Sequence, residues 1–385
     1  MIVNYVWTIA QSASAILIVL LLLFLIKVVL KQKWYFPLLI CVALFGLDLG
    51  IEIIANSKLI SKVPHLLYIN EPFNLLYGVM IFLYARGHEL QRLKFYRKDF
   101  LFFIPFLLSV LNYIPYYFID GTEKVTDFIA SGNVSSDINE NIWEWIFMIS
   151  INLVFLWAAL NRFQNYTSKI KALYSDIQQK DFHRTQFLIK TVMAFYLLQL
   201  IVVYLIYYGV PYSSSIYNFY DLVMIILLSL IGYDALQSYK FASDIRENWE
   251  KIQLLGKANK YAKSTLTQAN SELIKTKLET CMAEEKPFLN PQIRIKELAE
   301  LTGFSTHQLS QVLNESFGQN FYEFINTQRI NTAKLLLTDK NYENFTFTAI
   351  GFEAGFNSKT AFYTAFKKET GTTPANFKHS NTSHN

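Results

Sequence analysis

Apolar residues fill most of the first 233 positions of the chain, in stretches separated by short polar loops. A helix needs roughly 20 predominantly apolar residues to cross about 30 Å of hydrocarbon. Stretches of about that length lie near residues 10–30, 34–55, 66–85, 100–119, 142–160, 186–208 and 216–233. The pattern predicts a seven-helix transmembrane bundle over residues 1–233.

From residue 234 onward the chain is polar, and apolar residues return at the spacing of amphipathic helices. Residues 234–286 are predicted to form a helical linker, with an amphipathic helix between 267 and 286 that ends at Pro287. The apolar stripe of this helix holds Leu273 or Ile274, Leu278, Cys281 and Met282. The stripe packs either on the domain that follows or on a second copy of the chain, and we favour packing within the chain.

Residues 287–385 carry a short helix, a tight turn and a second helix twice, in units over residues 295–314 and 347–369. Glycine permits the tight turn, at Gly303 in the first unit and at Gly355 in the second. Ser305 is expected to cap the helix after the first turn, and Ser358 to start the helix after the second. A connecting helix runs from about 321 to 337. The predicted core positions are Leu298, Ala299, Leu301, Leu309, Val312 and Leu313 in the first unit, Phe324, Ile325, Ile330, Ala333, Leu336 and Leu337 in the connecting helix, and Phe362, Ala365 and Phe366 in the second unit.

The two units form an internal repeat. Gly303, Phe304, Leu309, Leu313 and Gly318 of the first unit correspond to Gly355, Phe356, Phe362, Phe366 and Gly371 of the second. Two such units on one frame can enter successive major grooves about 34 Å apart. A monomer is therefore expected to read two half-sites on one face of a duplex.

The second helix of each unit is expected to enter the major groove, so its outward residues are the candidate DNA contacts. These residues are Thr306, His307, Ser310 and Gln311 in the first unit and Lys359, Thr360, Tyr363, Thr364 and Lys367 in the second. Four of them are expected to reach base edges, namely Lys359, Thr360, His307 and Gln311. The others are expected to be shared between bases and phosphates.

The composition also indicates two kinds of domain. With 52% apolar, 16% aromatic and 17% charged residues, the 385-residue chain is too apolar for one water-soluble domain. Cys41 in an apolar stretch and Cys281 in the linker do not suit a disulfide framework or a metal site. The sequence contains no Walker motif, kinase signature or nucleophile-elbow serine. We expect no cofactor, no metal and no enzymatic activity.

Lysine and arginine residues in short loops predict the orientation of the spans, because loops rich in these residues stay in the cytoplasm. The loops after the first, third and fifth predicted spans hold Lys31, Lys33, Arg86, Arg92, Lys94, Arg97, Lys98, Arg162, Lys169, Lys171, Lys180 and Arg184. The other loops hold Lys58, Lys62 and Lys124. This asymmetry predicts an N-terminus outside and a C-terminal domain in the cytoplasm, with the spans in the inner (plasma) membrane of a bacterium.

Carboxylates inside the predicted spans mark a candidate ligand-sensing site, because a charge in hydrocarbon costs several kcal/mol unless it is paired or hydrated. Asp48, Glu52, Glu71 and Asp221, together with Glu144, fall in the outer half of the predicted spans. Turned inward, they would form an acidic vestibule for a cation, an amine, a proton or a hydroxyl-rich ligand. Alternatively, they lie at the level of the headgroups or satisfy polar contacts between helices.

Two strings carry a family resemblance. IGFEAGFNSKTAFYTAFKKETGTTPANF resembles the C-terminal signature of the AraC/XylS transcription regulators, and IKELAELTGFSTHQLSQVLNESFGQNFYEFINTQRINTAKLLL resembles their first unit and connecting helix. With several membrane spans before these strings, the layout is similar to that of the membrane-bound AraC-type regulators of Bacteroidetes-like bacteria. The chain departs from the family at Thr364, where arginine is frequent. Residues 291–385 also hold nine Lys and Arg against eight Asp and Glu, so we expect a modest affinity for DNA.

The resemblance implies an all-α protein in which a seven-helix transmembrane bundle precedes a cytoplasmic AraC-type double helix-turn-helix domain. Its implied partners are double-stranded promoter DNA, RNA polymerase, the lipid bilayer, an unidentified ligand and a second copy of the chain. Two alternatives remain open at this point. In the first, the bundle acts only as a passive anchor. In the second, the protein is a membrane transporter or enzyme whose cytoplasmic tail binds protein partners.

Overall fold

The computed structural model describes residues 2–55, 58–121, 123, 126, 134–177, 183–208, 223, 226, 230, 232–233 and 266–382. Every regular element in these ranges is a helix, and the β contact found there is an isolated bridge between Tyr174 and Arg294. The predicted all-helical fold is confirmed over the described residues. The chain divides into two compact units, Met1–Tyr166 with Phe182–Lys240 and Thr167–Asp181 with Phe241–Asn385.

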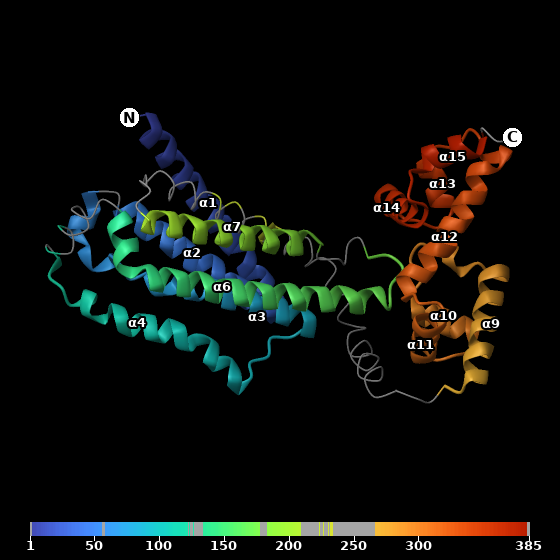
Figure 1. Ribbon diagram of the computed structural model, residues 1–385, viewed down its shortest axis with the longest axis horizontal. Coiled ribbons are helices and arrows are strands. Elements are labelled where there is room, and N and C mark those ends of the chain that lie inside the picture. Colours follow the sequence, from blue (N-terminus) through green and yellow to red (C-terminus); the bar gives the residue numbers. More distant parts are fainter. Residues whose placement is uncertain are drawn as a thin grey trace. The chain divides into compact units, whose positions relative to one another are not determined.

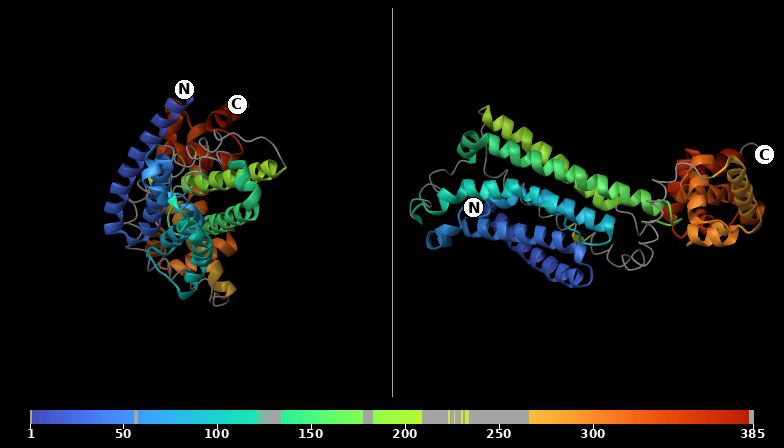
Figure 2. Two further views of the ribbon diagram at one scale, coloured as in Figure 1. Left: turned by 90° about the vertical axis from the view of Figure 1, so that its left-hand side faces the viewer. Right: turned by 90° about the horizontal axis from the view of Figure 1, so that it is seen from below.

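Long helices run side by side in the first unit (Figures 1 and 2). The helices are α1 (Ile2–Lys31), α2 (Phe36–Ala55), α3 (Tyr77–Leu90), α4 (Ile104–Tyr117), α6 (Val134–Lys171) and α7 (His183–Tyr207), with the 3-10 segments η4 (Glu71–Leu75) and η5 (Arg97–Phe103) before α3 and α4. Helix α1 packs against α2, and α2 packs against α3. The chain thus forms a helical bundle before the polar region begins.

Five described helical segments are long and apolar enough to span a membrane: Ala13–Lys31, Lys33–Ala55, Arg97–Pro115, Ile142–Lys171 and Thr185–Tyr207. The segments Pro64–Leu75 and Tyr77–Leu90 meet at a bend of 44° and make a sixth if they form one broken span. Pro72 lies at the start of η4, where it cannot donate a helical hydrogen bond. The stretch 216–233 lies mostly outside the described residues, so seven spans stay a prediction.

Two buried polar contacts hold α3 in place. Asn152 of α6 accepts a hydrogen bond from the Gly78 N–H at 2.8 Å and donates one to the carbonyl of Asn74 at 2.9 Å. A Cβ atom on Gly78 would lie 2.9 Å from Asn152 Oδ1, so only glycine permits this approach of α3 to α6. Farther along α3, the guanidinium of Arg86 donates to both carboxylate oxygens of Asp99, at 2.8 and 2.7 Å.

The second unit consists of two lobes joined by one helix (Figure 1). Its helices are α9 (Gln268–Glu284), α10 (Ile295–Thr302), α11 (Thr306–Ser316), α12 (Phe321–Thr338), α13 (Phe347–Glu353), α14 (Lys359–Thr370) and α15 (Pro374–Thr382), with the 3-10 segments η6 (Pro287–Leu289) and η7 (Lys340–Tyr342). The first lobe has a core that includes Leu278, Leu298, Leu309, Leu313 and Phe324, and the second has a core that includes Ile330, Ile350, Phe356, Phe362 and Phe366. Helix α12 contributes to both cores.

Helix α9 packs within the chain, as the sequence predicts. Ile274, Leu278, Cys281 and Met282 are all buried in the core of the first lobe, whereas Leu273 is exposed. Burial raises the pKa of the Cys281 thiol, which keeps this side chain neutral among its apolar neighbours.

One predicted core position is wrong. Leu301 is 44% exposed, and Thr302 is buried instead, with its hydroxyl donating to the carbonyl of Leu298 at 2.7 Å. Successive helical residues are about 100° apart, so positions 295, 298, 299 and 302 share a face that position 301 does not. The other predicted core positions are buried or partly buried, with Leu336 and Ala365 in the second group.

Candidate DNA-binding face

A glycine turn and a polar cap position the second helix of each helix-turn-helix unit. Gly303 and Gly355 have φ angles of 78° and 93°, in the left-handed region that favours glycine. Ser305 Oγ accepts a hydrogen bond from the Gln308 N–H at 3.2 Å, and Gln308 Oε1 accepts one from the Ser305 N–H at 3.0 Å. This reciprocal pair is a capping box, and it starts α11 at the predicted residue.

The second unit starts its helix in the same way. Ser358 Oγ accepts a hydrogen bond from the Ala361 N–H at 3.1 Å, which caps α14. Gly355 is also a packing requirement, because a Cβ atom there would lie 2.5 Å from the carbonyl oxygen of Phe288. The turn of the second unit therefore lies directly against η6, which precedes the first unit.

The predicted contacts of the first unit lie on the outward part of α11, but they are only half-exposed. Thr306, His307, Ser310 and Gln311 are each partly buried. The Nε2 atom of His307 is covered and has no hydrogen-bond partner, so this atom reaches a base only if the ring turns. Gln311 Nε2 donates to the carboxylate of Glu315 at 3.2 Å, and that contact must break before the amide can bind a base.

The predicted contacts of the second unit are more accessible. Lys359, Thr360, Thr364 and Lys367 are exposed on α14, and Tyr363 is half-buried. Lys359 Nζ lies 5.6 Å from the centroid of the Tyr363 ring, within the range of a cation–π contact. The exposed predicted contacts of α14 thus comprise two lysines and two threonines.

Arg329 of α12 is the cation at the junction of the lobes, and it is only 2% exposed. Its Nε atom donates to the carbonyl of Phe288 at 2.8 Å, and an Nη atom donates to the carbonyl of Asn290 at 2.9 Å. Burial lowers the pKa of this guanidinium to about 10, which still leaves it charged at neutral pH. Arg329 stabilises the junction and is not available to phosphates.

The predicted sensing carboxylates do not gather in one place. Asp48 accepts hydrogen bonds from Asn70 Nδ2 and from the Tyr77 hydroxyl, the latter at 3.2 Å. Glu52 accepts one from Gln11 Nε2 at 3.2 Å. Both carboxylates therefore satisfy polar contacts with neighbouring segments, which is the alternative that the sequence left open. Asp221 lies outside the described residues.

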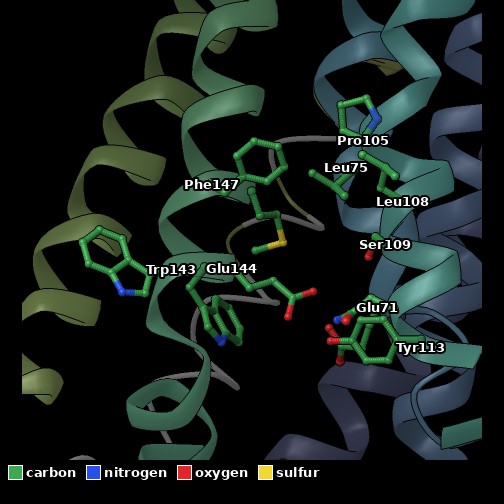
Figure 3. Close-up of a pocket in the computed structure, with 12 residues that line it drawn as sticks. Glu71, Leu75, Pro105, Leu108, Ser109, Tyr113, Trp143, Glu144 and Phe147 are labelled. Carbon is green, nitrogen blue, oxygen red and sulfur yellow. The ribbon is translucent and has the colours of Figure 1, made fainter. Parts of the chain in front are cut away.

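Glu71, in contrast, lines a cavity of about 450 Å³ between η4, α4 and α6. Glu144 lines the same cavity from α6, and its carboxylate extends toward the side that carries Glu71 and Tyr113 (Figure 3). Aromatic and apolar side chains complete the wall, among them Trp143, Trp145, Phe147, Met148, Leu75 and Leu108. A cavity of this size accommodates a small organic ligand.

Sequence reasoning missed two features of these sites. The sequence places Glu144 among the carboxylates of the predicted spans but does not pair it with Glu71, because the two residues belong to separate segments of the chain. Residues 171–177 carried no motif, although they lie against the helix-turn-helix lobes. Contacts over such long sequence separations leave no periodic signal in either segment.

Comparisons with known proteins agree with this geometry. A family model described as a helix-turn-helix domain matches residues 298–380. Uncharacterized HTH-type transcriptional regulators of Staphylococcus aureus strains COL and MSSA476 are each 33% identical to the chain over 136 residues. The match covers 35% of this chain and 18% of each regulator, so the chain spans under a fifth of their length. No solved structure matches. Residues 298–380 thus carry a helix-turn-helix domain.

Proposed function

We propose that the protein is a membrane-embedded, one-component transcription regulator. In this proposal α11 and α14 bind promoter DNA sequence-specifically, and a signal received by the first unit controls that binding. One observation supports the DNA-binding part of the proposal. The serine-capped helices α11 and α14 belong to two lobes that α12 joins, and all three helices lie in the stretch that matches a helix-turn-helix domain. RNA polymerase is the partner on which such a regulator acts.

The DNA contacts divide by chemistry. Thr360 and Lys359, at the start of α14, are placed for base edges, because the N-terminal residues of a recognition helix enter the groove first. Lys367, two turns later, suits a phosphate, which fixes register without reading sequence. The near-neutral charge of residues 291–385 implies few phosphate contacts and a weak dependence of affinity on salt.

A bilayer location is supported by the surface of the first unit. Large apolar side chains there are widely exposed, for example Ile16 at 64%, Leu108 at 59% and Phe100 at 73%. Large apolar side chains exposed in such numbers favour aggregation in water but are expected where a helix faces lipid. We place these helices in the inner membrane of a bacterium, with the N-terminus outside and the C-terminal unit in the cytoplasm.

The cavity between η4, α4 and α6 is the proposed sensing site. Two carboxylates and several aromatic rings favour an organic cation, because carboxylates bind ammonium groups and aromatic faces attract them. Of the ligand classes expected from the sequence, which were a cation, an amine, a proton or a hydroxyl-rich ligand, the cavity favours the amine. This assignment also transfers the sensing role from Asp48 and Glu52 to Glu71 and Glu144.

Enrichment from a random duplex library tests the DNA-binding proposal. The full chain in lipid nanodiscs should enrich sequences with two half-sites about 10 base pairs apart, centre to centre. The double variant Lys359→Ala/Thr360→Ala should lose the half-site that α14 reads and keep the other. Loss of one half-site with retention of the other separates a recognition defect from unfolding.

Other outcomes would favour other functions. Failure of the full chain to enrich any sequence would contradict the proposal and favour a membrane transporter or enzyme whose tail binds proteins. Enrichment that does not respond to any signal through the first unit would favour the passive anchor.

A further inference from the structure

A short segment of the second unit, residues 171–177, contacts both helix-turn-helix lobes, and we call it the strap. Lys171 is the last residue of α6, and α6 contains the candidate span Ile142–Lys171. The strap is thus joined directly to a helix of the apolar bundle. It belongs to the second unit and is distant in sequence from the rest of that unit.

Backbone hydrogen bonds attach the strap to the first lobe. The Ile295 N–H donates to the carbonyl of Leu173 at 3.1 Å, and the Ser175 N–H donates to the carbonyl of Ile293 at 3.4 Å. These bonds flank an antiparallel bridge between Tyr174 and Arg294. In this pattern Tyr174 and Arg294 are a non-hydrogen-bonded pair, whose side chains lie close together.

Side-chain contacts reinforce the backbone pairing. The guanidinium of Arg294 lies 5.4 Å from the centroid of the Tyr174 ring, and Tyr174 and Ser175 are both buried. Leu173 packs against the core of the first lobe. Ser175 Oγ also donates to the carbonyl of Ile293 at 2.7 Å. The strap is therefore packed as part of the lobe rather than laid over it.

Arg329 ties the strap to the junction of the two lobes. Besides its bonds to the carbonyls of Phe288 and Asn290, this buried guanidinium donates to Ser175 Oγ at 3.3 Å. A buried charge needs its hydrogen-bond partners, so loss of Ser175 from this site carries a free-energy cost for Arg329. The strap and the relation between the lobes are thereby coupled through one side chain.

The last contact reaches the second lobe at the start of its recognition helix. Asn357 Nδ2 donates to Asp176 Oδ2 at 2.5 Å. Asn357 directly precedes Ser358, which caps α14. The N-terminus of a helix attracts anions, and in helix-turn-helix proteins this end of the second helix faces the DNA. Asp176 thus holds a negative charge beside the end of α14 that a DNA phosphate would approach.

From these contacts we propose that the strap is an autoinhibitory element. When the strap is docked, Asp176 repels DNA phosphates at the start of α14. The strap's pairing with residues 293–295 and its contact with Arg329 also hold the two lobes in one relative position. When the strap is released, the start of α14 becomes free to enter the groove between the DNA phosphates. The strap follows α6 in the chain, so a change in α6 can shift the balance between docked and released forms.

This inference deepens the proposed function and rests on it, because it supplies the link between the first unit and the DNA-binding lobes. It is tested by locking the strap. Tyr174→Cys with Arg294→Cys, in a chain with Cys41→Ala and Cys281→Ala, places two thiols at the bridge positions. The Cα spacing of such a pair, about 4.5 Å, suits a disulfide.

The locked and unlocked forms are compared in the same protein. The full chain in nanodiscs is oxidised or reduced, and its affinity for the duplex that it enriches is measured. Oxidation should weaken binding roughly tenfold or more, because it removes the released population that binds DNA, and reduction should restore binding. The reduced form controls for folding and for the loss of the Arg294 charge.

A second variant tests the charge without a covalent lock. Asp176→Asn keeps the shape of the side chain but removes the repulsion, so affinity for the duplex should rise by roughly threefold or more. Glu279→Gln, which neutralises an exposed carboxylate on α9, is the matched control. Its affinity should equal that of the unmodified protein.

Equal or tighter binding in the oxidised form, or no gain from Asp176→Asn beyond that of Glu279→Gln, would overturn the autoinhibitory role while DNA binding stands. Absence of sequence-specific binding in the unmodified and reduced proteins alike would instead overturn the proposed function, and this inference with it.

Discussion

Lys359 is one of the residues proposed to reach base edges, and its position allows the proposed role to be tested. It is the first residue of α14, it is solvent-exposed, and its ammonium group lies 5.6 Å from the centroid of the Tyr363 ring. If α14 enters the major groove as proposed, a lysine at this position either donates to a guanine edge or neutralises a phosphate. These two roles have different signatures in binding measurements.

We expect Lys359→Ala to reduce discrimination between the enriched duplex and a scrambled one by about 1–3 kcal/mol, because a base contact is lost. Titrations of both duplexes at several salt concentrations measure this effect. Lys340→Ala, at an exposed lysine in η7, is the control and should leave discrimination unchanged. Equal weakening on both duplexes, with a smaller salt slope, would instead assign Lys359 to a phosphate.

At the scale of elements, the cavity between η4, α4 and α6 is built from segments that are far apart in the sequence. Glu71 comes from the 3-10 segment η4, and Glu144 comes from the N-terminal part of α6. The 44° bend between Leu75 and Tyr77 turns η4 away from the axis of α3, and η4 packs against α4. The sensing proposal therefore depends on the bent pair and not on one straight span.

Tryptamine and its neutral counterpart tryptophol probe this cavity, because they share an indole ring and differ in charge. We expect Glu71→Gln/Glu144→Gln to weaken tryptamine binding by about tenfold or more, since hydrogen bonds to a charged group are worth roughly 1.5–3 kcal/mol. Tryptophol binding should not change. Calorimetry on the full chain in nanodiscs measures both ligands.

Asp48→Asn is the matched control, because the Asp48 carboxylate binds Asn70 and Tyr77 instead of lining the cavity. This variant should bind tryptamine normally. If Asp48→Asn abolished binding and the glutamate pair did not, the acidic vestibule expected from the sequence would be the better description.

At the scale of the whole molecule, the proposed membrane location of the apolar unit requires a defined orientation. Twelve lysine and arginine residues lie in the loops after the first, third and fifth predicted spans, against three in the other loops. The strap lies in one of these cationic loops. Because the strap contacts the helix-turn-helix lobes, both must lie on the same side of the membrane, and the proposed function places that side in the cytoplasm.

Reporter fusions measure this orientation directly. A reporter active only outside the cytoplasm should be active when fused within residues 56–62 or 127–133 and silent after residue 92, 171 or 382. A reporter that fluoresces only in the cytoplasm should give the reverse pattern. Activity of the first reporter after residue 382 would place the lobes away from the chromosome and exclude transcription regulation.

The helix-turn-helix part of the fold was largely predictable because its signals are local. Turn glycines, capping serines and apolar residues at helical spacing all act within a few residues, so Ser305, Ser358 and the buried Leu309 and Phe362 lie where expected. Leu301 was the exception, because hydrophobicity outweighed helical phase in the prediction. The count of spans was less predictable, because one predicted span is bent and another lies mostly outside the described residues.

The sequence by itself determined the two kinds of domain, the repeat of two helix-turn-helix units and the helix faces that form their cores, because each depends on composition or on contacts one or two turns apart. Only the tertiary structure decided which carboxylates share a cavity and that Asn152 accepts a hydrogen bond from Gly78. It also decided that Ser175 contacts Arg329 and that Asp176 contacts Asn357. These partners are separated by 73 to 181 residues. At such separations the packing of whole helices, and not any local propensity, sets which side chains meet.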